Sequence, residues 1–201
     1  MTNEQYFTPQ PSSPSSPYVI RVALPDGTLN LTTDRGVFSY GALDTGTRLL
    51  LLKAPQPPTT GDLLDLGCGV GPIALTLARR SPTATVWAVD VNERAVALCR
   101  QNADANDITN VRAVLADGVP DDVQFECIWS NPPIHIGKAA LHELLLQWLA
   151  RLTPTGTAVL VVQRHLGSDS LQAWLTAHGY PTERLASAKG FRLLEITRAA
   201  I

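Results

Sequence analysis

The sequence has few cysteines, little net charge and no long hydrophobic run, and each of these features argues against a class of protein. Three cysteines without a C-x-x-C spacing, Cys68, Cys99 and Cys127, are expected to be buried reduced thiols rather than a disulfide framework. A net charge of −2 offers no overall attraction for nucleic acid, so an RNA partner would need a local basic patch. No apolar run has the length of a membrane span, no secretory leader is recognisable, and the four histidines lack a metal-ligand spacing. We therefore expect a cytoplasmic protein with neither a membrane segment nor a metal.

The 201 residues, 45% of them hydrophobic, suffice for one domain with a buried core. Residues 1–17 are rich in proline, serine and threonine, a composition typical of a disordered tail. Residues 18–60 are expected to form a β-hairpin around the turn 25–27 and a helix beginning near residue 44, both packed on the domain that follows. The main domain is expected to span residues 61–201.

From residue 61 onward, strand-like apolar segments alternate with helix-like segments. This alternation predicts a Rossmann-like, doubly wound α/β fold with a mostly parallel sheet. Counting from the strand at 63–66, we expect seven strands in the order 3-2-1-4-5-7-6, with the last one antiparallel. Asn92 and Ser168 are expected to cap the helices that begin there. The predicted strands are 63–66, 85–90, 111–115, 125–130, 158–162, 182–187 and 191–197, and the predicted helices are 72–80, 92–105, 138–152 and 168–179.

A glycine-rich turn, Asp65-Leu66-Gly67-Cys68-Gly69-Val70-Gly71-Pro72, follows the first of these strands. A strand-to-helix turn of this kind presents free N–H groups that bind an anionic part of a ligand. The spacing is not the G-x-G-x-x-G of dinucleotide folds, because Pro72 takes the place of the third glycine. The pattern resembles the first motif of class I S-adenosylmethionine-dependent methyltransferases. That resemblance implies that the turn meets the carboxylate of the cofactor and that Asp65 meets its ammonium. The residues assigned to the cofactor here are Asp65, Gly67, Cys68, Gly69 and Gly71.

Two further acidic residues are expected at the ends of the next two strands. Asp90, followed by Val91, ends the second strand, where a carboxylate accepts hydrogen bonds from two ribose hydroxyls. An acid that only stabilises a helix N-terminus is the alternative. Asp117, followed by Gly118, ends the third strand and is expected to meet the adenine amino group, unless it only forms a turn. These four residues extend the predicted site for S-adenosyl-L-methionine.

The stretch Asn131-Pro132-Pro133-Ile134 follows the fourth strand and is the most informative one. Two prolines there suit neither a helix nor a sheet ladder and predict a rigid loop. In the expected strand order this loop lies beside the glycine-rich turn, at the switch point of the sheet. The Asn131 side-chain oxygen and the Pro132 carbonyl are acceptors that together can hold the two hydrogens of an NH2 group and aim its lone pair at a methyl group. Asn131 and Pro132 are therefore the candidate catalytic residues, acting by alignment and by stabilising charge on nitrogen.

Together these motifs resemble the methyltransferase small domain family, within the class I methyltransferases that carry N-P-P-[aromatic] and methylate amino groups. The resemblance covers roughly residues 33–197 and implies a ribosomal RNA guanine-N2 methyltransferase in single-domain form, with the class I domain at 61–201. It also implies that Phe38 and the helix start at Gly46-Thr47 cover the methionine end of the cofactor. The chain departs from the family in two ways: Ile134 stands where many relatives have an aromatic ring, and only a short hairpin stands where the ribosomal enzymes carry a second, degenerate domain.

The expected substrate is RNA, either naked or in an assembled ribosomal subunit. Three alternatives stay open: a protein glutamine N5-methyltransferase, because a glutamine amide suits the same two acceptors; a small-molecule amine methyltransferase; and an S-adenosylmethionine-binding module without catalysis. The candidate substrate contacts are Ile134, His135, Lys138 and Arg192, and further basic or histidine side chains near the same edge are Arg35, Arg164, His165 and Lys189.

Overall fold

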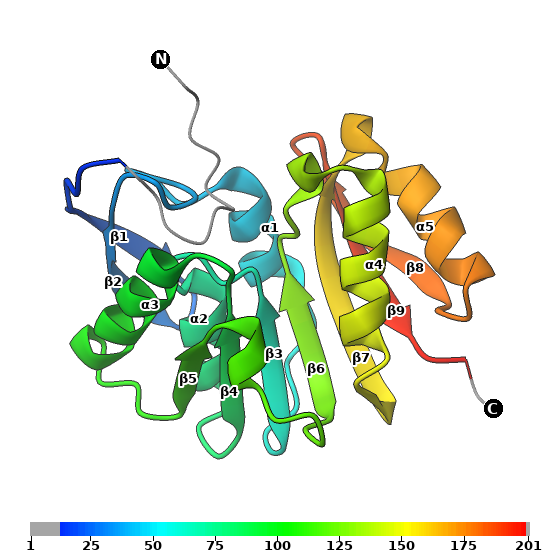
Figure 1. Ribbon diagram of the computed structural model, residues 1–201, viewed down its shortest axis with the longest axis horizontal. Helices are drawn as coiled ribbons and strands as arrows, with labels where there is room; N and C mark the ends of the chain where they lie inside the picture. The colour runs from blue at the N-terminus through cyan, green and yellow to red at the C-terminus, as the bar shows by residue number, and fades with distance from the viewer. Residues whose placement is uncertain (1–12, 200–201) are drawn as a thin grey trace.

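The computed structural model describes residues 13–199, which form a seven-stranded sheet with helices on both faces and a separate two-stranded hairpin (Figure 1). The hairpin consists of β1 (Tyr18–Leu24) and β2 (Gly27–Thr33). The large sheet consists of β3 (Asp62–Leu66), β4 (Thr85–Val89), β5 (Val111–Val114), β6 (Phe125–Ser130), β7 (Leu152–Gln163), β8 (Thr182–Ala188) and β9 (Phe191–Thr197). The helices are α1 (Thr45–Lys53), α2 (Pro72–Arg80), α3 (Glu93–Ala105), α4 (Lys138–Leu149) and α5 (Ser168–Ala177), and short 3₁₀ turns are η1 (Ala116–Gly118), η2 (Ile134–Ile136) and η3 (Arg164–Leu166).

The order of the strands, β5-β4-β3-β6-β7-β9-β8, confirms the predicted order 3-2-1-4-5-7-6 when strands are counted from β3. Strands β3 to β7 pair in parallel, and β9 is antiparallel to both of its neighbours, β7 and β8. The two halves of the sheet meet where β3 lies beside β6, and the chain passes from one half to the other in the connection from β5 to β6. In sheets of this type the crevice at such a crossing, at the carboxyl ends of the strands, is where ligands bind.

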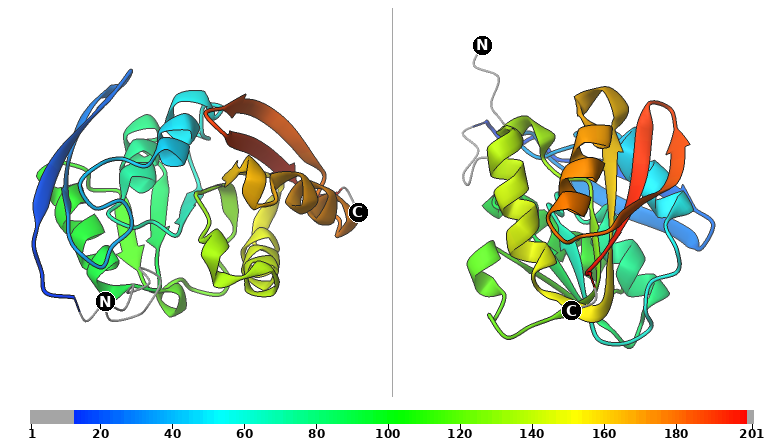
Figure 2. Two further views of the ribbon diagram at one scale, coloured as in Figure 1. Left: turned by 90° about the horizontal axis from the view of Figure 1, so that it is seen from above. Right: turned by 90° about the vertical axis from the view of Figure 1, so that its right-hand side faces the viewer.

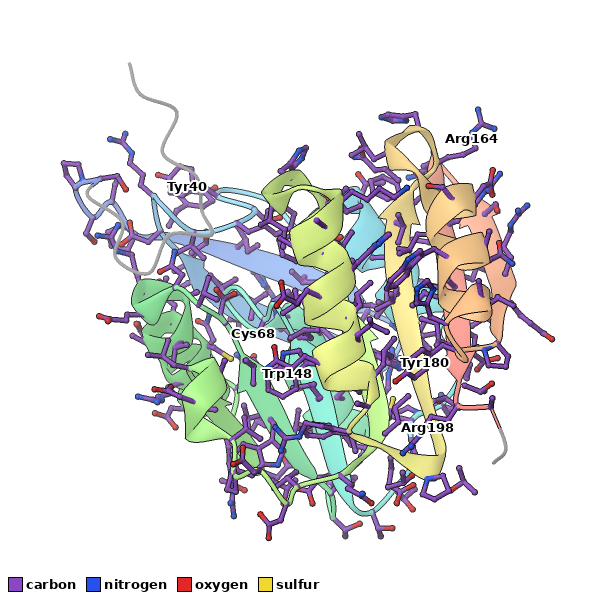
Figure 3. All side chains as sticks on the ribbon, turned by 45° about the vertical axis from the view of Figure 1, so that its right-hand side comes forward. Tyr40, Cys68, Trp148, Arg164, Tyr180 and Arg198 are labelled. Carbon is purple, nitrogen blue, oxygen red and sulfur yellow. The ribbon has the colours of Figure 1, made fainter. Side chains whose placement is uncertain are left out.

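The two faces of the sheet are covered by different helices, because buried side chains alternate along each strand. On β3, Leu63 belongs to the core shared with α1, α2 and α3, whereas Leu64 and Leu66 belong to the core shared with α4 and α5. Figure 2 shows the two helical layers with the sheet between them. Cys68 lies in the first core and Trp148 in the second (Figure 3). The ligand-binding edge of the sheet is thus supported from both sides.

Two asparagine side chains, Asn102 in α3 and Asn106 at its C-cap, fasten the hairpin to the main domain by making the hydrogen bonds that a neighbouring strand would make. Asn102 accepts a hydrogen bond from the Thr32 N–H at 2.7 Å and donates one to the Thr32 carbonyl at 2.9 Å. Asn106 makes the same pair of bonds with Asn30, at 3.0 and 2.8 Å. Because these bonds satisfy the backbone of β2 on the side that faces α3, the hairpin packs on the domain instead of standing free.

The structure differs from the sequence-based expectation at two element boundaries. Ser168 does not cap α5: Gly167, with a φ of 100°, is the N-cap, because a left-handed backbone at that turn favours glycine. Ser168 is instead the first helical residue, with a buried hydroxyl that has no partner among the described residues. Helix α4 ends at Leu149, and β7 already begins at Leu152, because residues 153–156 continue as extended chain past an irregularity in the pairing with β6.

The predicted tail, residues 1–17, lies mostly outside the described residues. Ser15 and Ser16 are described, and their hydroxyl and N–H donate to the Asp34 carboxylate at 2.7 and 2.5 Å. The predicted hairpin and helix extension of residues 18–60 corresponds to β1, β2 and α1, and α1 begins at Thr45 as expected.

The three cysteines are buried free thiols, as predicted. Within residues 13–199, no helix is long and apolar enough to cross a membrane. The same part of the chain contains no group of three or more His, Cys, Asp or Glu side chains that could hold a metal ion.

Candidate functional site

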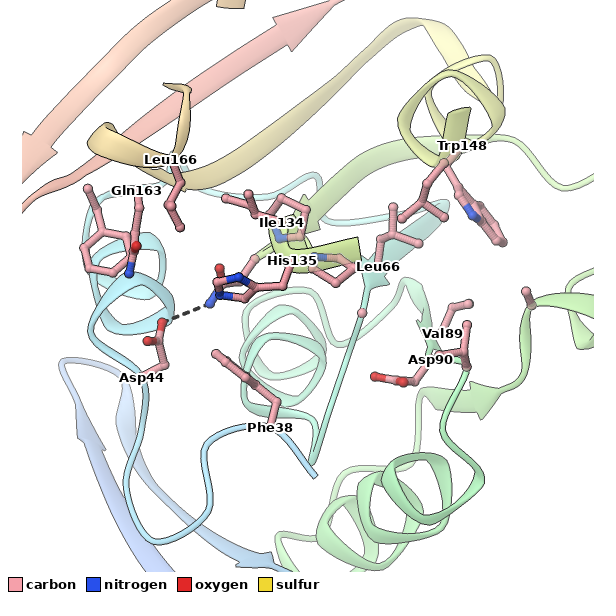
Figure 4. A pocket seen from close by; sticks show the side chains of 18 residues that line it. Phe38, Asp44, Leu66, Val89, Asp90, Ile134, His135, Trp148, Gln163 and Leu166 are labelled. Carbon is pink, nitrogen blue, oxygen red and sulfur yellow. Dashed lines mark hydrogen bonds between the residues drawn. The ribbon is translucent and has the colours of Figure 1, made fainter. Parts of the chain in front are cut away.

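A cavity opens at the carboxyl ends of β3, β4, β6 and β7, where the chain crosses between the halves of the sheet (Figure 4). Its walls are mainly apolar, with a few polar groups that converge on it, a combination typical of small-molecule sites. The lining residues are Phe38, Asp44, Leu66, Gly67, Val89, Asp90, Val91, Ala116, Asn131, Pro132, Pro133, Ile134, His135, Leu144, Trp148, Gln163, Leu166 and Phe191.

A second, smaller cavity lies along the glycine-rich turn. Phe38, Gly67 and Asn131 line both cavities, so these residues stand at the junction between the two. Thr47 and the turn residues 68–70 line only the second cavity. The two spaces thus extend from the glycine-rich turn to the end of β4, an arrangement that suits an elongated ligand with an amino-acid end and a nucleoside end.

Hydrogen bonds within the protein hold the glycine-rich turn. The N–H groups of Gly67 and Cys68 both donate to the Val89 carbonyl, at 2.8 and 2.9 Å, and the Gly69 N–H donates to the Asp90 carboxylate at 2.9 Å. The structure differs here from the expectation of free N–H groups, because these three donors are already used by β4 and the residue that follows it. What the turn offers is space, since a Cβ on Gly69 would meet no atom within 4 Å.

Asp65 lies beneath the turn, fully buried, and lines neither cavity. Its Oδ2 accepts the Ala74 N–H at 2.8 Å near the start of α2, whereas Oδ1 has no partner among the described residues. Burial raises the pKa of Asp65 well above its usual range, and the nearby Asp90 carboxylate adds to this effect. A buried carboxylate oxygen without a partner requires a donor. Oδ1 is thus an acceptor without a donor, but it lies outside both cavities, so a contact of Asp65 with a ligand ammonium stays a prediction.

Asp90 follows β4 and points into the first cavity (Figure 4). Its Oδ2 accepts the Gly69 N–H at 2.9 Å, and its Oδ1 accepts the Asn92 N–H at 3.0 Å. Each oxygen keeps a second lone pair, so the carboxylate can accept two more hydrogen bonds. Burial raises the pKa of Asp90, although its backbone hydrogen bonds lower it. With Val91 beside it in the cavity wall, Asp90 fits the two hydroxyls of a ribose.

Asn131 follows β6, and two residues at the start of α1 orient its side chain. Its Nδ2 donates to Asp44 Oδ2 at 2.9 Å (Figure 4) and to Thr47 Oγ1 at 3.0 Å. Both amide hydrogens are thereby used, which leaves Oδ1 as the acceptor for other groups. The Pro132 carbonyl accepts the Ile134 N–H at 2.9 Å and keeps one lone pair. Both acceptors of the predicted catalytic pair thus have capacity for an NH2 group.

Two predicted cofactor residues, Gly46 and Gly71, line neither cavity and are required by packing. A Cβ on Gly46 would lie 2.7 Å from the Phe191 ring, and a Cβ on Gly71 would lie 2.7 Å from the sulfur of Cys99. Gly71 is also the N-cap of α2, with a φ of 92°. These two glycines shape the site by letting its walls approach each other.

The end of β5 contributes a different residue from the one predicted. Asp117 and Gly118 are exposed in η1 and line neither cavity, whereas Ala116 lines the first one. A contact of Asp117 with adenine therefore stays a prediction.

The four predicted substrate contacts lie in different surroundings. Ile134 and His135 line the first cavity, and Lys138 lines a neighbouring pocket together with Ile134. Arg192 forms an ion pair with Asp169 of α5 and does not line the cavity.

Several lining residues escaped the sequence analysis. Leu144 and Trp148 on α4 are four residues apart, the spacing of any helix face that packs on a core, so nothing in the sequence distinguishes them as site residues. Gln163 follows the rule that singled out Asp90 and Asn131, because it ends a central strand at the same edge of the sheet. The residues missed in this way include Leu144, Trp148, Gln163, Leu166 and Phe191.

Comparison with known proteins gives a consistent result. The family model described as "Methyltransferase small domain" matches residues 28–195. The chain is 37% identical over 171 residues to the uncharacterized protein YbxB of Bacillus subtilis, covering 84% of this chain and 85% of that protein. It is 35% identical over 159 residues to the ribosomal RNA small subunit methyltransferase C of Shewanella sp. strain MR-4, covering 76% of this chain and 46% of that enzyme.

Among solved structures, a 16S rRNA N2 methyltransferase of T. thermophilus in complex with AdoMet and guanosine has a TM-score of 0.79 and 25% identity, covering 92% of this chain and 51% of that one. The precorrin-6y C5,15-methyltransferase of Geobacter metallireducens has a TM-score of 0.64 at 16% identity, covering 84% and 94% of the two chains, and shares the fold alone. The chain thus spans about half the length of the ribosomal RNA methyltransferases that it matches.

Proposed function

This chain belongs to the methyltransferase small domain family of S-adenosylmethionine-dependent methyltransferases, and from that premise we propose that it methylates the exocyclic N2 amine of a guanine in ribosomal RNA. The observation that carries the proposal is the oriented Asn131 side chain, which stands at the junction of the two cavities with its amide hydrogens engaged. The relatives named for ribosomal RNA methylation, and the similar structure in complex with guanosine, support the choice of base. We expect the protein to act in the cytoplasm, where ribosomes are assembled.

The residues of the site suit S-adenosylmethionine along its length. The unpartnered oxygen of buried Asp65 suits the ammonium, and the two remaining acceptor sites of Asp90 suit the ribose hydroxyls. Phe38, which lines both cavities, is suited to cover the cofactor between these two ends. When bound, S-adenosylmethionine supplies an electrophilic methyl group.

The protein contributes to the reaction by aligning the reacting groups. Asn131 Oδ1 and the Pro132 carbonyl accept the two N–H groups of the target amine, which turns the nitrogen lone pair toward the methyl group and favours a tetrahedral nitrogen. As the N–C bond formed and the S–CH3 bond of the sulfonium broke to leave a neutral thioether, positive charge would grow on the nitrogen, and the two oxygens would stabilise that charge. The methylated nitrogen then releases one proton to water. Because the proton becomes acidic only once the methyl group has arrived, the site requires no strong base.

The charge around the cavity favours RNA over a neutral substrate. The segments 131–142, 164–168 and 188–191, on the β6, β7 and β9 side of the cavity, contain no Asp or Glu. The last two segments adjoin, since the Arg164 N–H donates to the Gly190 carbonyl at 2.8 Å. Arg164 extends outward at the end of β7 (Figure 3). A local cationic rim of this kind attracts phosphates although the whole chain has a net charge of −2. Its exposed cationic members are Lys138, Arg164 and Lys189, and the exposed side chains of His135 and His165 lie in the same segments.

The test is methyl transfer from radiolabelled S-adenosylmethionine to RNA, ribosomal subunits and total protein from a strain that lacks this gene. We expect RNase-sensitive label that is recovered as N2-methylguanosine after digestion. Label in protein would support a glutamine methyltransferase instead. Absence of label from every macromolecule, with the cofactor bound, would contradict the RNA substrate and favour a small amine or a binding module.

The variant Asn131→Ala tests the role of the loop within this function. We expect it to lower kcat by at least about 100-fold, since alignment of the reacting atoms supplies most of the catalysis. The dissociation constant for S-adenosylmethionine, measured by calorimetry, should change little, because Asp65 and Asp90 are intact. Wild-type turnover in Asn131→Ala would refute the proposed mechanism.

A further inference from the structure

We propose that Asp44 is a positioning residue, which determines that the oxygen rather than the nitrogen of the Asn131 amide faces the reacting group. Asp44 lies 87 residues before Asn131, at the start of α1, and its Oδ2 accepts a hydrogen bond from Asn131 Nδ2 at 2.9 Å. The inference rests on the proposed role of Asn131 and assigns a function to a residue outside the N-P-P loop.

The chemistry of the two side chains gives the orientation. An amide can present either its NH2 or its oxygen to a given neighbour, and the two ends have almost the same shape. A carboxylate only accepts hydrogen bonds. A flipped Asn131 would therefore place its oxygen opposite Asp44 Oδ2 at about the same distance, and the charge-assisted hydrogen bond between the two side chains would be lost. The hydroxyl of Thr47, 3.0 Å from Nδ2, can donate as well as accept and therefore does not discriminate by itself. Asp44 is thus the partner that selects the orientation.

The position of Asp44 is itself held by the fold. The same Oδ2 accepts the Thr47 N–H at 2.8 Å, which makes Asp44 the N-cap of α1. The carbonyl of Asp44 accepts the Arg48 N–H at 2.9 Å, and Leu50 and Leu51 bury the next turn of the helix in the core. One oxygen therefore ends the helix and fixes the amide, so the start of α1 is a rigid reference for the loop after β6.

The charge of Asp44 also favours catalysis through Asn131. A carboxylate that accepts one of the amide hydrogens polarises the amide and increases the negative character of its oxygen. That oxygen is the one which meets the positive charge on the target nitrogen. Orientation and polarisation both act on kcat, and neither involves contact of Asp44 with the cofactor.

A series of substitutions separates the cap from the positioning role. Ser is about as good an N-cap as Asp, but its hydroxyl can donate as well as accept and so does not select one amide orientation. Asn keeps an oxygen acceptor at the cap without the charge, and Ala removes both functions. For thermal stability we expect the wild type, Asp44→Asn and Asp44→Ser to be similar and Asp44→Ala to be lower. For kcat we expect Asp44→Asn to be intermediate, and Asp44→Ser and Asp44→Ala each to be lowered about 10- to 100-fold.

The readouts are kcat, KM for RNA, the dissociation constant for S-adenosylmethionine, and the hydrogen exchange of the Asn131 side-chain NH2 in the cofactor-free protein. The expected result for Asp44→Ser is a loss in kcat at unchanged cofactor affinity, with faster exchange of the NH2. In the Asn131→Ala background, Asp44→Ser should have no further effect on the residual rate. A kcat of Asp44→Ser within twofold of wild type, while Asn131→Ala is inactive, would overturn the positioning role alone. Wild-type turnover of Asn131→Ala would overturn the proposed function and this inference with it.

Discussion

Replacing Asp90 by Ala should weaken the binding of S-adenosylmethionine, because it removes the carboxylate that follows β4 and lines the cavity. The carboxylate has about four lone-pair sites, of which the Gly69 and Asn92 N–H groups occupy two. Because Asp90 lines the cavity, we expect the remaining two to accept hydrogen bonds from the vicinal hydroxyls of a ribose. Hydrogen bonds to a charged group contribute about 1.5–3 kcal/mol each. Loss of both therefore costs at least about 3 kcal/mol, or about 100-fold in the dissociation constant.

The pH dependence gives a second expectation for the same residue. Burial raises the pKa of Asp90, so its carboxylate takes up a proton at a pH above the ordinary aspartate range. A protonated carboxyl has lost acceptor capacity, so cofactor affinity of the wild type should fall as the pH is lowered through that raised pKa. The variant Asp90→Asn, which has no carboxyl to titrate, should bind with an affinity that varies less over the same interval.

Isothermal titration calorimetry with S-adenosylmethionine checks both expectations. Asp104→Ala serves as the control, because it removes the same charge from an exposed position on α3. If Asp90→Ala bound the cofactor within threefold of the wild type, the assignment of Asp90 to the ribose would be wrong. A loss of similar size in Asp104→Ala would mean that net charge, not hydrogen bonding, governs the affinity.

Two further predictions concern stability. Burial raises the pKa of Asp65, so the native state keeps a proton that the unfolded state releases. The free energy of unfolding of the cofactor-free wild type should therefore fall as the pH rises above about 4, by up to about 1.4 kcal/mol per pH unit. Asp65→Asn should lack that slope, and equal slopes in urea titrations of the two proteins between pH 4 and 7 would contradict the raised pKa of Asp65. Asn102→Ala should cost about 3 kcal/mol, because it removes three hydrogen bonds to buried or half-buried groups, at Thr32 and Val70. Asn106→Ala, which removes three bonds at a more exposed site, should cost about 1 kcal/mol or less, and equal losses for the two variants would show that burial is not the deciding factor.

The parts of the fold and site that depend on strand ends could be predicted from the sequence. A buried apolar strand followed by a polar residue fixes the location of that residue, because parallel strands bring their carboxyl ends to one edge. Asp90, Asn131 and the glycine-rich turn were found in this way, and the structure brings all three to one cavity. The predicted strand order followed from the same alternation and is confirmed.

The details that depend on contacts between distant segments could not be predicted. The turn 67–71 was expected to have free N–H groups, but those of residues 67–69 donate to Val89 and Asp90 at the end of β4, a contact that exists only once the sheet has formed. Ser168 has the composition of a helix cap, and the local backbone at Gly167 overrides it. Trp148 joins the cavity wall only because α4 packs against the sheet at that depth.

The start of α1 has the largest consequence for the site. The family resemblance assigns Phe38 and the helix start at Gly46-Thr47 to the methionine end of the cofactor, but nothing in the sequence of residues 18–60 indicates a contact with the loop that follows β6. In the folded chain, Thr47 and Asp44 bind Asn131, and Phe38 lines both cavities. A loop with two prolines is stiff in its backbone but leaves the asparagine amide free to rotate, so the loop alone cannot define the orientation of the acceptor. The segment before the glycine-rich turn supplies that missing constraint, and the catalytic loop and α1 are therefore best regarded as one site assembled from two parts of the chain.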